Sequence, residues 1–374
     1  MDCHKDVMKS AYSEPTPSEG MIVITNRMQQ LLKASLASLL VGATSVASAG
    51  DVTGAGATFP APVYAKWAEI YHNANGTAVN YQAIGSGGGI KQIKKRTVDF
   101  GATDAPLNGK ELKKIGLLQF PAIIGGIVPV INVDGIEPGQ LRLSGPVLAD
   151  MFSGAITKWN APAVAELNPD LKLPDKPITV VYRSDSSGTT SGFTTYLAEV
   201  KEGFADKVGA GKTVNWPTGV GGKGNAGVAA NVLKLGNSIG YVEYAYVKQN
   251  KMSHAAMINK AGQTVQPNDK TFAAAAAGAD WSAAPGFGIS LNNQGADAAW
   301  PITSASFILM FLEAERPEQS AEVLAFFDWA LTEGQEPALE LDYVPLPPET
   351  VKLIRTAWGD IKDEDGAVVY KPAH

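Results

Sequence analysis

The sequence is poor in the residues that build covalent links and metal sites. Cys3 is the only cysteine among 374 residues, so no disulfide can form within the chain. The four histidines are His4, His72, His254 and His374, and none lies close to another in the sequence. A zinc or iron site built on histidine and cysteine is therefore not expected, and we predict neither a metal nor a cofactor.

An excess of positive charge is also missing. The chain has 31 basic and 37 acidic residues and a formal net charge of −6. A general affinity for nucleic acid or for acidic membranes is therefore not expected. The hydrophobic fraction of 45% and the charged fraction of 18% are typical of a soluble globular protein, and the length suggests two domains. If this protein binds an anion, local geometry must hold it against the overall charge.

No apolar run near the N-terminus is long enough to span a membrane, but a shorter one is present. Residues 28–49 combine a basic flank, a mildly apolar stretch and the small-residue sequence Ala47-Ser48-Ala49. This pattern favours a signal peptide cleaved after Ala49 over a short buried helix, and it implies export. Residues 1–20 are polar and resemble nothing foldable, which leaves open whether translation starts at Met1, Met21 or Met28.

The first part of the exported chain has the pattern of a β-α-β unit. Strands are expected at 78–84 and 98–102, with a short helix at 90–96 between them. Ser86 and Asp104 would then follow strand ends, which is where ligands bind in open α/β sheets. A preceding helix after Pro60 is expected from four apolar residues that share one face: Val63, Trp67, Ile70 and Tyr71.

The rest of the chain predicts a second α/β lobe. Strands are expected at 178–182 and 239–244, and a helix at 189–200. The apolar runs 123–133 and 301–312 read as buried strands that carry the chain between two lobes.

Three glycine-rich segments, 54–59, 85–89 and 218–227, are expected to be loops. They do not match nucleotide-binding motifs. The dinucleotide fingerprint needs glycine where Phe59 stands, and a Walker A motif ending at Lys212 needs glycine where Asp206 stands. These glycines are therefore assigned to turns and close packing.

The segment RSDSSGT, residues 183–189, lies where a strand becomes a helix. Free N–H groups at a helix start, hydroxyls at Ser187 and Thr189, and the planar guanidinium of Arg183 would together form a seat for an anion. The plainer alternative is that the hydroxyls only cap the helix. A nucleophilic serine is disfavoured, because the segment is not the G-x-S-x-G elbow and neither His72 nor His254 has a setting that favours a base.

Two acidic residues lie near these segments, Asp104 and Asp185. A carboxylate can only accept hydrogen bonds, so it favours an oxyanion that still carries a proton and disfavours one that does not. Phosphate near neutral pH keeps one or two protons, whereas sulfate keeps none. A buried acid that faces the ligand would therefore select phosphate against sulfate. Taken alone, each of these aspartates could equally be a turn or cap residue.

Several stretches resemble the periplasmic phosphate-binding proteins of ABC transporters, the PstS family. The resemblance is carried by the stretches GAGATFPAPVYAKW (54–67), NYQAIGSGGGIKQI (80–93), VDFGATDAPL (98–107), RSDSSGTTSGFT (183–194) and GVGGKGNAGVA (219–229). It implies an α/β, two-lobed periplasmic-binding-protein fold of type II, with a hinge and the ligand in the cleft between the lobes. Lobe I would comprise 50–122 and 302–374, and lobe II 123–301, after an N-terminal extension and signal peptide at 1–49.

The resemblance also implies the contacts to phosphate. They would be made by Ala57, Thr58, Phe59, Ser86, Asp104, Arg183, Asp185, Ser187, Gly188 and Thr189. Asp104 would accept the phosphate proton, and Asp185 would hold Arg183 in place.

The function implied by the resemblance is high-affinity phosphate binding in the periplasm without catalysis. The protein, a monomer with no nucleic-acid partner, would deliver phosphate to the permease and ATPase subunits of an inner-membrane ABC transporter. Two alternatives stay open: a phosphatase that uses the same contacts, and a receptor for another oxyanion such as sulfate or molybdate.

Overall fold

The computed structural model of the protein describes residues 51–372. The expected extension and signal peptide, residues 1–49, lie outside the described residues. Within 51–372, no helix combines the length and the apolar character that a membrane crossing requires.

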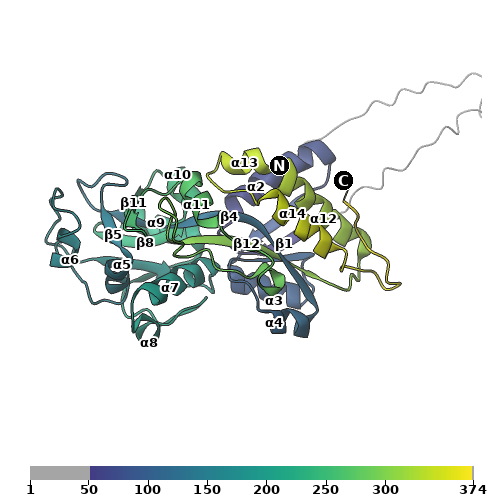
Figure 1. Ribbon diagram of the computed structural model, residues 1–374, viewed down its shortest axis with the longest axis horizontal. Coiled ribbons are helices and arrows are strands. Elements are labelled where there is room, and N and C mark those ends of the chain that lie inside the picture. The colour runs from purple at the N-terminus through teal and green to yellow at the C-terminus, as the bar shows by residue number, and fades with distance from the viewer. Residues whose placement is uncertain (1–50, 373–374) are drawn as a thin grey trace, which may run out of the picture. The chain divides into compact units, whose positions relative to one another are not determined.

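A curled, mixed sheet organises the fold (Figure 1). Its strands follow the order β2-β1-β3-β12-β4-β8-β6-β7, and β9 also pairs with β4. The strands are β1 Val52–Gly56, β2 Val79–Ala83, β3 Phe100–Thr103, β4 Leu117–Asn132, β6 Thr179–Arg183, β7 Val220–Gly222, β8 Ser238–Glu243, β9 Ser253–His254 and β12 Thr303–Phe311. A smaller sheet has the order β11-β10-β5, with β5 at Arg142–Ser144, β10 at Ala256–Ile258 and β11 at Thr264–Val265.

Strand β4 joins two groups of strands. Its first part, residues 117–126, pairs antiparallel with β12, and its second part, residues 127–132, pairs antiparallel with β8. Almost every residue of β4 is buried, which is what a continuous apolar sequence dictates for a strand covered on both faces. The expected strands at 123–133 and 301–312 are therefore confirmed, and β4 passes from one group to the other.

Helices cover both faces of the strand group β2-β1-β3-β12. Figure 1 shows α2, α12 and α14 on one side of it and α3 and α4 on the other. The helices are α2 Ala61–Asn75, α3 Ser86–Lys94, α4 Gly109–Ile115, α12 Pro317–Thr332, α13 Gln335–Leu339 and α14 Pro348–Trp358. The indole of Trp67 on α2 is buried and donates to the Gly334 carbonyl at 2.7 Å, which ties α2 to the segment between α12 and α13. Parallel pairing of β1 with both β2 and β3 confirms the expected β-α-β unit.

The second strand group is built in the same way. Strand β6 pairs in parallel with both β7 and β8, and helices α7 and α9 pack against β8. The remaining helices are α5 Gly145–Phe152, α6 Pro162–Ala165, α7 Gly188–Val200, α8 Phe204–Lys207, α9 Gly224–Lys234, α10 Tyr244–Gln249 and α11 Asp269–Ala276, with a short 3-10 turn η1 at Pro285–Phe287. In parallel groups of this kind, each helix starts near the carboxyl end of the strand before it, so α3, α7 and α9 all begin at the same edge of the sheet.

The three glycine-rich segments are more ordered than the sequence indicates. Residues 54–56 belong to strand β1, Ser86 is already the first residue of α3, and 218–227 contains strand β7 and the start of α9. The expectation of loops was wrong because these glycines serve long-range packing. A Cβ atom on Gly54 would lie 2.1 Å from the ring of Phe100, so only glycine lets β1 and β3 pack this closely. Helix α2 also differs in detail from the prediction. Its buried face includes Tyr64 and does not include Ile70.

Replacing Gly89 with Ala tests this packing argument. A Cβ atom at residue 89 would lie 2.5 Å from the Gly56 Cα, a backbone contact that no side-chain movement relieves. We expect the variant to lose about 2 kcal/mol of unfolding free energy, as overpacked cores do. Gly236→Ala is the control, because a Cβ atom there meets nothing within 4 Å. Urea unfolding of both variants measures the difference, and equal stabilities would contradict the close approach of α3 to β1.

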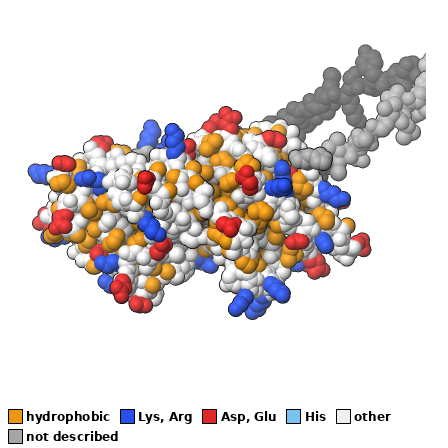
Figure 2. Space-filling model, viewed as in Figure 1, with side chains coloured by type: hydrophobic (Ala, Val, Ile, Leu, Met, Phe, Trp, Pro, Cys, Tyr) orange, Lys and Arg blue, Asp and Glu red, His pale blue; other side chains and the backbone are white. Residues whose placement is uncertain are grey.

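Acidic and basic side chains are interspersed over most of the face shown in Figure 2. Basic side chains gather at the lower edge of that face, below the strands. The exposed lysines of α3 and α4 include Lys91, Lys94, Lys110, Lys113 and Lys114.

Candidate functional site

The ten residues singled out in the sequence come together where α3, α7 and α9 begin. The Ser86 hydroxyl, at the start of α3, accepts from the backbone N–H of Gly188, at the start of α7, at 3.0 Å. The Thr58 hydroxyl, shortly after β1, accepts from the backbone N–H of Asn225, at the start of α9, at 3.1 Å. The first N–H groups of each helix have no partner within the helix, and the helix start carries a partial positive charge. Three such starts directed at one place favour an anion there.

Arg183 is the cation of the site. Its side chain is only 1% exposed, and it is held by Asp185 through two hydrogen bonds, from Nε at 2.8 Å and from Nη2 at 2.6 Å. Nη1 donates to the Thr189 hydroxyl at 3.2 Å. Although burial acts to raise the pKa of the Asp185 carboxyl, the hydrogen bonds and the charge of Arg183 lower it, so Asp185 is ionised. The pair is therefore close to neutral, and the expectation that Asp185 holds Arg183 in place is confirmed.

Four buried hydroxyls in the site each act as acceptors. Those of Ser86 and Thr58 accept as described above, that of Ser187 accepts from the N–H of Thr190, and that of Thr189 accepts from Arg183. In the hydrogen bonds found among residues 51–372, none of the four is a donor. Because a hydroxyl has one proton to give, each of them can still donate to a ligand. Ser187 thus caps α7, as the plainer interpretation predicted, without losing its donor.

Asp104 supplies a carboxyl group, which can only accept hydrogen bonds when it is ionised. It is 4% exposed, and neither of its carboxylate oxygens has a hydrogen-bond partner within the described chain. Burial raises the pKa of Asp104 to about 7. The Ser306 and Ser86 hydroxyls and the charge of Arg183 lie close enough to offset part of the effect, although neither hydroxyl has the geometry of a hydrogen bond to the carboxylate. A Cβ atom on Gly188 would lie 2.6 Å from an Asp104 oxygen, so the carboxyl group faces the start of α7 directly. An unpartnered buried carboxyl is costly, and in a native protein it points to a role in binding or catalysis.

The pKa of Asp104 makes the stability of the unliganded protein depend on pH. The pKa is about 7 in the folded chain, against 3.8 for an ordinary aspartate, so the folded state holds this proton more tightly. The resulting stabilisation is present at low pH and is lost as the pH rises from about 4 to about 7. Relative to Asp104→Asn, we expect wild type to lose on the order of 4 kcal/mol over that range, since each unit of pKa difference corresponds to about 1.4 kcal/mol. Urea unfolding in phosphate-free buffer measures this, and parallel profiles for the two proteins would contradict it.

Asn225 is a site residue that sequence reasoning missed. It is fully buried, and its Nδ2 donates to the Thr58 hydroxyl at 2.7 Å and to the Thr189 hydroxyl at 3.1 Å. Its Oδ1 accepts from the N–H of Glu243 at 2.9 Å. Asn225 therefore links hydroxyls that come from both strand groups. The signal in the sequence was an asparagine inside the segment GGKGNAG, whose glycines are expected to serve turns and close packing.

The backbone of residues 57–59 completes the site. The N–H of Ala57 donates to the Ala102 carbonyl at 3.0 Å, which fixes the segment beside β3. Phe59 is fully buried and packs its ring edge to face against Tyr343, with ring centres 6.2 Å apart.

Asp104 also borders a cavity of about 160 Å³ between α7, β12 and residues 288–292. The arrangement offers many hydrogen-bond donors, one neutralised cation and one acceptor, which suits an oxyanion that carries a proton.

Comparison with known proteins places the chain in a family. Residues 41–333 match the model of the PBP superfamily domain. The chain is 55% identical over 324 residues to the phosphate-binding protein PstS of Pasteurella multocida, covering 86% of this chain and 94% of that one. It is 52% identical over 320 residues to the phosphate-binding protein PstS of Haemophilus influenzae, covering 86% and 96%.

Solved structures agree on the fold. A putative phosphate ABC transporter substrate-binding protein from Clostridium perfringens, solved with bound phosphate, superposes with a TM-score of 0.59 at 20% identity over 79% of this chain and 100% of that one. A phosphate-binding protein from Stenotrophomonas maltophilia gives a TM-score of 0.66 at 19% identity over 86% and 99%. Together with the sequence matches, which are far closer, these findings lead to one conclusion: the chain belongs to the PstS family of phosphate-binding proteins, within the PBP superfamily.

Proposed function

We propose that the protein is a non-catalytic receptor that binds inorganic phosphate in the periplasm and delivers it to an inner-membrane ABC transporter. The observation that carries the proposal is the pairing of four hydroxyls free to donate with one buried carboxyl that has nothing to accept from. The hydroxyls and helix starts suit any oxyanion. When Asp104 is ionised, which its pKa of about 7 ensures at mildly alkaline pH, only an oxyanion with its own proton also satisfies it, and hydrogen phosphate is such an ion. Sequence relatives named as phosphate-binding proteins support the same assignment.

In this proposal Thr58, Ser86, Ser187 and Thr189 donate their hydroxyl protons to phosphate. The backbone N–H groups of Thr58 and Phe59 add to them, while those of Ala57 and Gly188 donate to the Ala102 carbonyl and the Ser86 hydroxyl. Arg183 supplies charge, Asp185 orients it, and Asp104 accepts the phosphate proton. A bound anion thus meets donors from both strand groups, as a closing cleft requires.

The proposed binding of the anion between the two strand groups also implies a division into two lobes. Lobe I would consist of residues 50–122 and 302–374, and lobe II of residues 123–301. The proposed hinge lies in β4, which pairs with β12 on one side and with β8 on the other. The protein would act as a monomer, exported through a signal peptide at its N-terminus, and dock its loaded form on the permease.

Equilibrium dialysis with radiolabelled orthophosphate tests the proposal. We expect saturable one-to-one binding that a large excess of sulfate or molybdate does not displace, and no hydrolysis of a phosphate ester. Displacement by sulfate at comparable concentration would favour the alternative of a general oxyanion receptor. Ester turnover that is lost in Ser187→Ala would favour the phosphatase alternative.

A further inference from the structure

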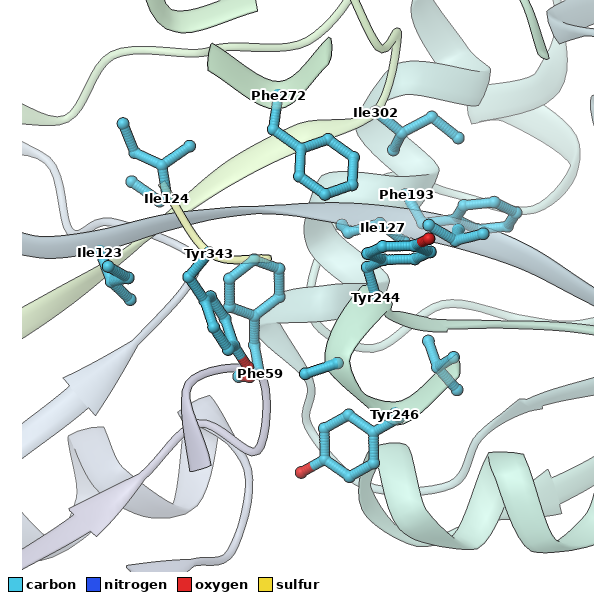
Figure 3. Close-up of a cluster of buried hydrophobic side chains, with 14 of the residues drawn as sticks. Phe59, Ile123, Ile124, Ile127, Phe193, Tyr244, Tyr246, Phe272, Ile302 and Tyr343 are labelled. Atoms are coloured by element: carbon cyan, nitrogen blue, oxygen red, sulfur yellow. Dashed lines mark hydrogen bonds between the residues drawn. The ribbon is translucent and has the colours of Figure 1, made fainter. Parts of the chain in front are cut away.

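Three tyrosine hydroxyls donate to three successive carbonyls of the segment 57–59. Tyr81 donates to the Ala57 carbonyl at 2.7 Å, Tyr246 to the Thr58 carbonyl at 2.6 Å, and Tyr343 to the Phe59 carbonyl at 2.6 Å. The tyrosines come from β2, from α10 and from the segment after α13. Figure 3 shows Tyr343 and Tyr246 on either side of Phe59. Distant parts of the chain therefore converge on one short stretch of backbone.

The hydrogen bonds from Tyr81 and Tyr246 set the direction of two N–H groups in the site. A peptide unit is planar and trans, so its C=O and its N–H point in opposite directions. When Tyr246 fixes the Thr58 carbonyl, it also fixes the N–H of Phe59, and Tyr81 fixes the N–H of Thr58 through the Ala57 carbonyl in the same way. Burial raises the pKa of all three tyrosines, so their hydroxyls stay protonated and remain donors.

Glu243 extends this arrangement behind Tyr343. Its Oε2 lies 2.7 Å from the Tyr343 hydroxyl and accepts from the N–H of Ala245 at 2.9 Å. Tyr343 has one proton, and the Phe59 carbonyl can only accept it. The Tyr343–Glu243 hydrogen bond is then complete only if Glu243 is protonated and donates. Burial indeed raises the pKa of Glu243 well above its usual range, and the nearby Asp104 raises it further, against the backbone hydrogen bonds from Ala245 and Tyr244.

We propose that Tyr81 and Tyr246 are positioning residues for the oxyanion site, which aim the N–H groups of Thr58 and Phe59 at the ligand by holding the Ala57 and Thr58 carbonyls. This rests on the proposed phosphate function. Because Tyr246 lies in proposed lobe II and its acceptor in proposed lobe I, closure of the cleft sets the direction of the Phe59 N–H. Tyr343 holds the Phe59 carbonyl, but that peptide unit continues to Pro60 and has no N–H, so Tyr343 anchors the segment without aiming a donor.

Single hydroxyl deletions in the full chain test the proposal. Tyr246→Phe removes the shorter of two hydrogen bonds to the Thr58 carbonyl and leaves only the one from the Ala61 N–H at 3.4 Å, and we expect phosphate to bind about ten-fold more weakly through a faster off-rate. The phosphate-induced shift of the Phe59 amide proton should also shrink. Tyr244→Phe is the matched control, since it removes a hydroxyl from the same helix while its ring remains packed against Phe272. Tyr81→Phe, in a partly buried position, supplies a second test through the Thr58 amide should Tyr246→Phe not fold.

The outcomes separate this inference from the proposed function. If wild type binds no phosphate, the proposed function fails. If wild type binds but Tyr246→Phe and Tyr81→Phe change only the melting temperature, and leave the off-rate and the amide shifts at control values, the tyrosines are merely structural and the inference is overturned.

Discussion

Asp104→Asn is expected to lower the preference for phosphate over sulfate at least about 100-fold. Polar mismatches in a buried site discriminate by about 10⁴–10⁵-fold, and here the mismatch is the carboxyl group that has no hydrogen-bond partner among residues 51–372. An asparagine amide can donate to sulfate, and its carbonyl can still accept from hydrogen phosphate. Sulfate binding should therefore strengthen far more than phosphate binding weakens. Competitive titration calorimetry with both anions at one ionic strength measures the ratio.

Asp185→Asn is the control for this substitution. It makes the same chemical change at a carboxylate that contacts Arg183 and the N–H of Gly224, not the proposed position of the phosphate proton. We expect it to change the affinity for both anions by similar factors. Equal losses of affinity for both anions in Asp104→Asn would show that Asp104 does not accept a hydrogen bond from the ligand's proton.

Replacing Arg183 with Met should weaken phosphate binding by about three orders of magnitude. Truncating one partner of a buried, hydrogen-bonded charge pair costs roughly 3–5 kcal/mol. Here the loss removes the cation of the site and leaves Asp185 as an uncompensated negative charge beside the anion. Arg183→Lys keeps the charge but cannot make the two-point contact with Asp185, so we expect an intermediate affinity.

Two further variants separate binding from stability. In Arg183→Met with Asp185→Asn, the stranded charge is gone, so we expect unfolding free energy to recover while phosphate affinity stays low. Lys201→Met breaks a half-exposed salt bridge to Asp150 and should leave affinity unchanged. A loss of affinity below ten-fold in Arg183→Met would contradict the placement of Arg183 against the ligand.

The sequence predicts the parts of this site that depend on local pattern. Asp104 follows a strand, and Arg183 precedes Asp185 by two residues at another strand end, so both were found from their neighbours alone. The long apolar runs predicted β4 and β12 for the same reason. Family resemblance supplied what local pattern does not, chiefly the roles of Thr58 and Ser86.

The parts that were missed depend on contacts between distant segments. Glycines 54 and 56 look like a loop until Phe100 and Ala102 are seen packed against them. Asn225 looks like a turn residue until its amide is found between Thr58 and Thr189. The tyrosines that hold residues 57–59 are up to 284 positions away from their acceptors, a separation that no local pattern can bridge.

Titration calorimetry of the wild-type protein tests the central claim most directly. The protein is first unfolded and refolded to remove bound ligand, and it is then titrated with phosphate and separately with sulfate at the same ionic strength. We expect tight one-to-one binding of phosphate and no heat from sulfate. Binding of both anions, or of neither, would contradict a site in which Asp104 selects the ligand by its proton.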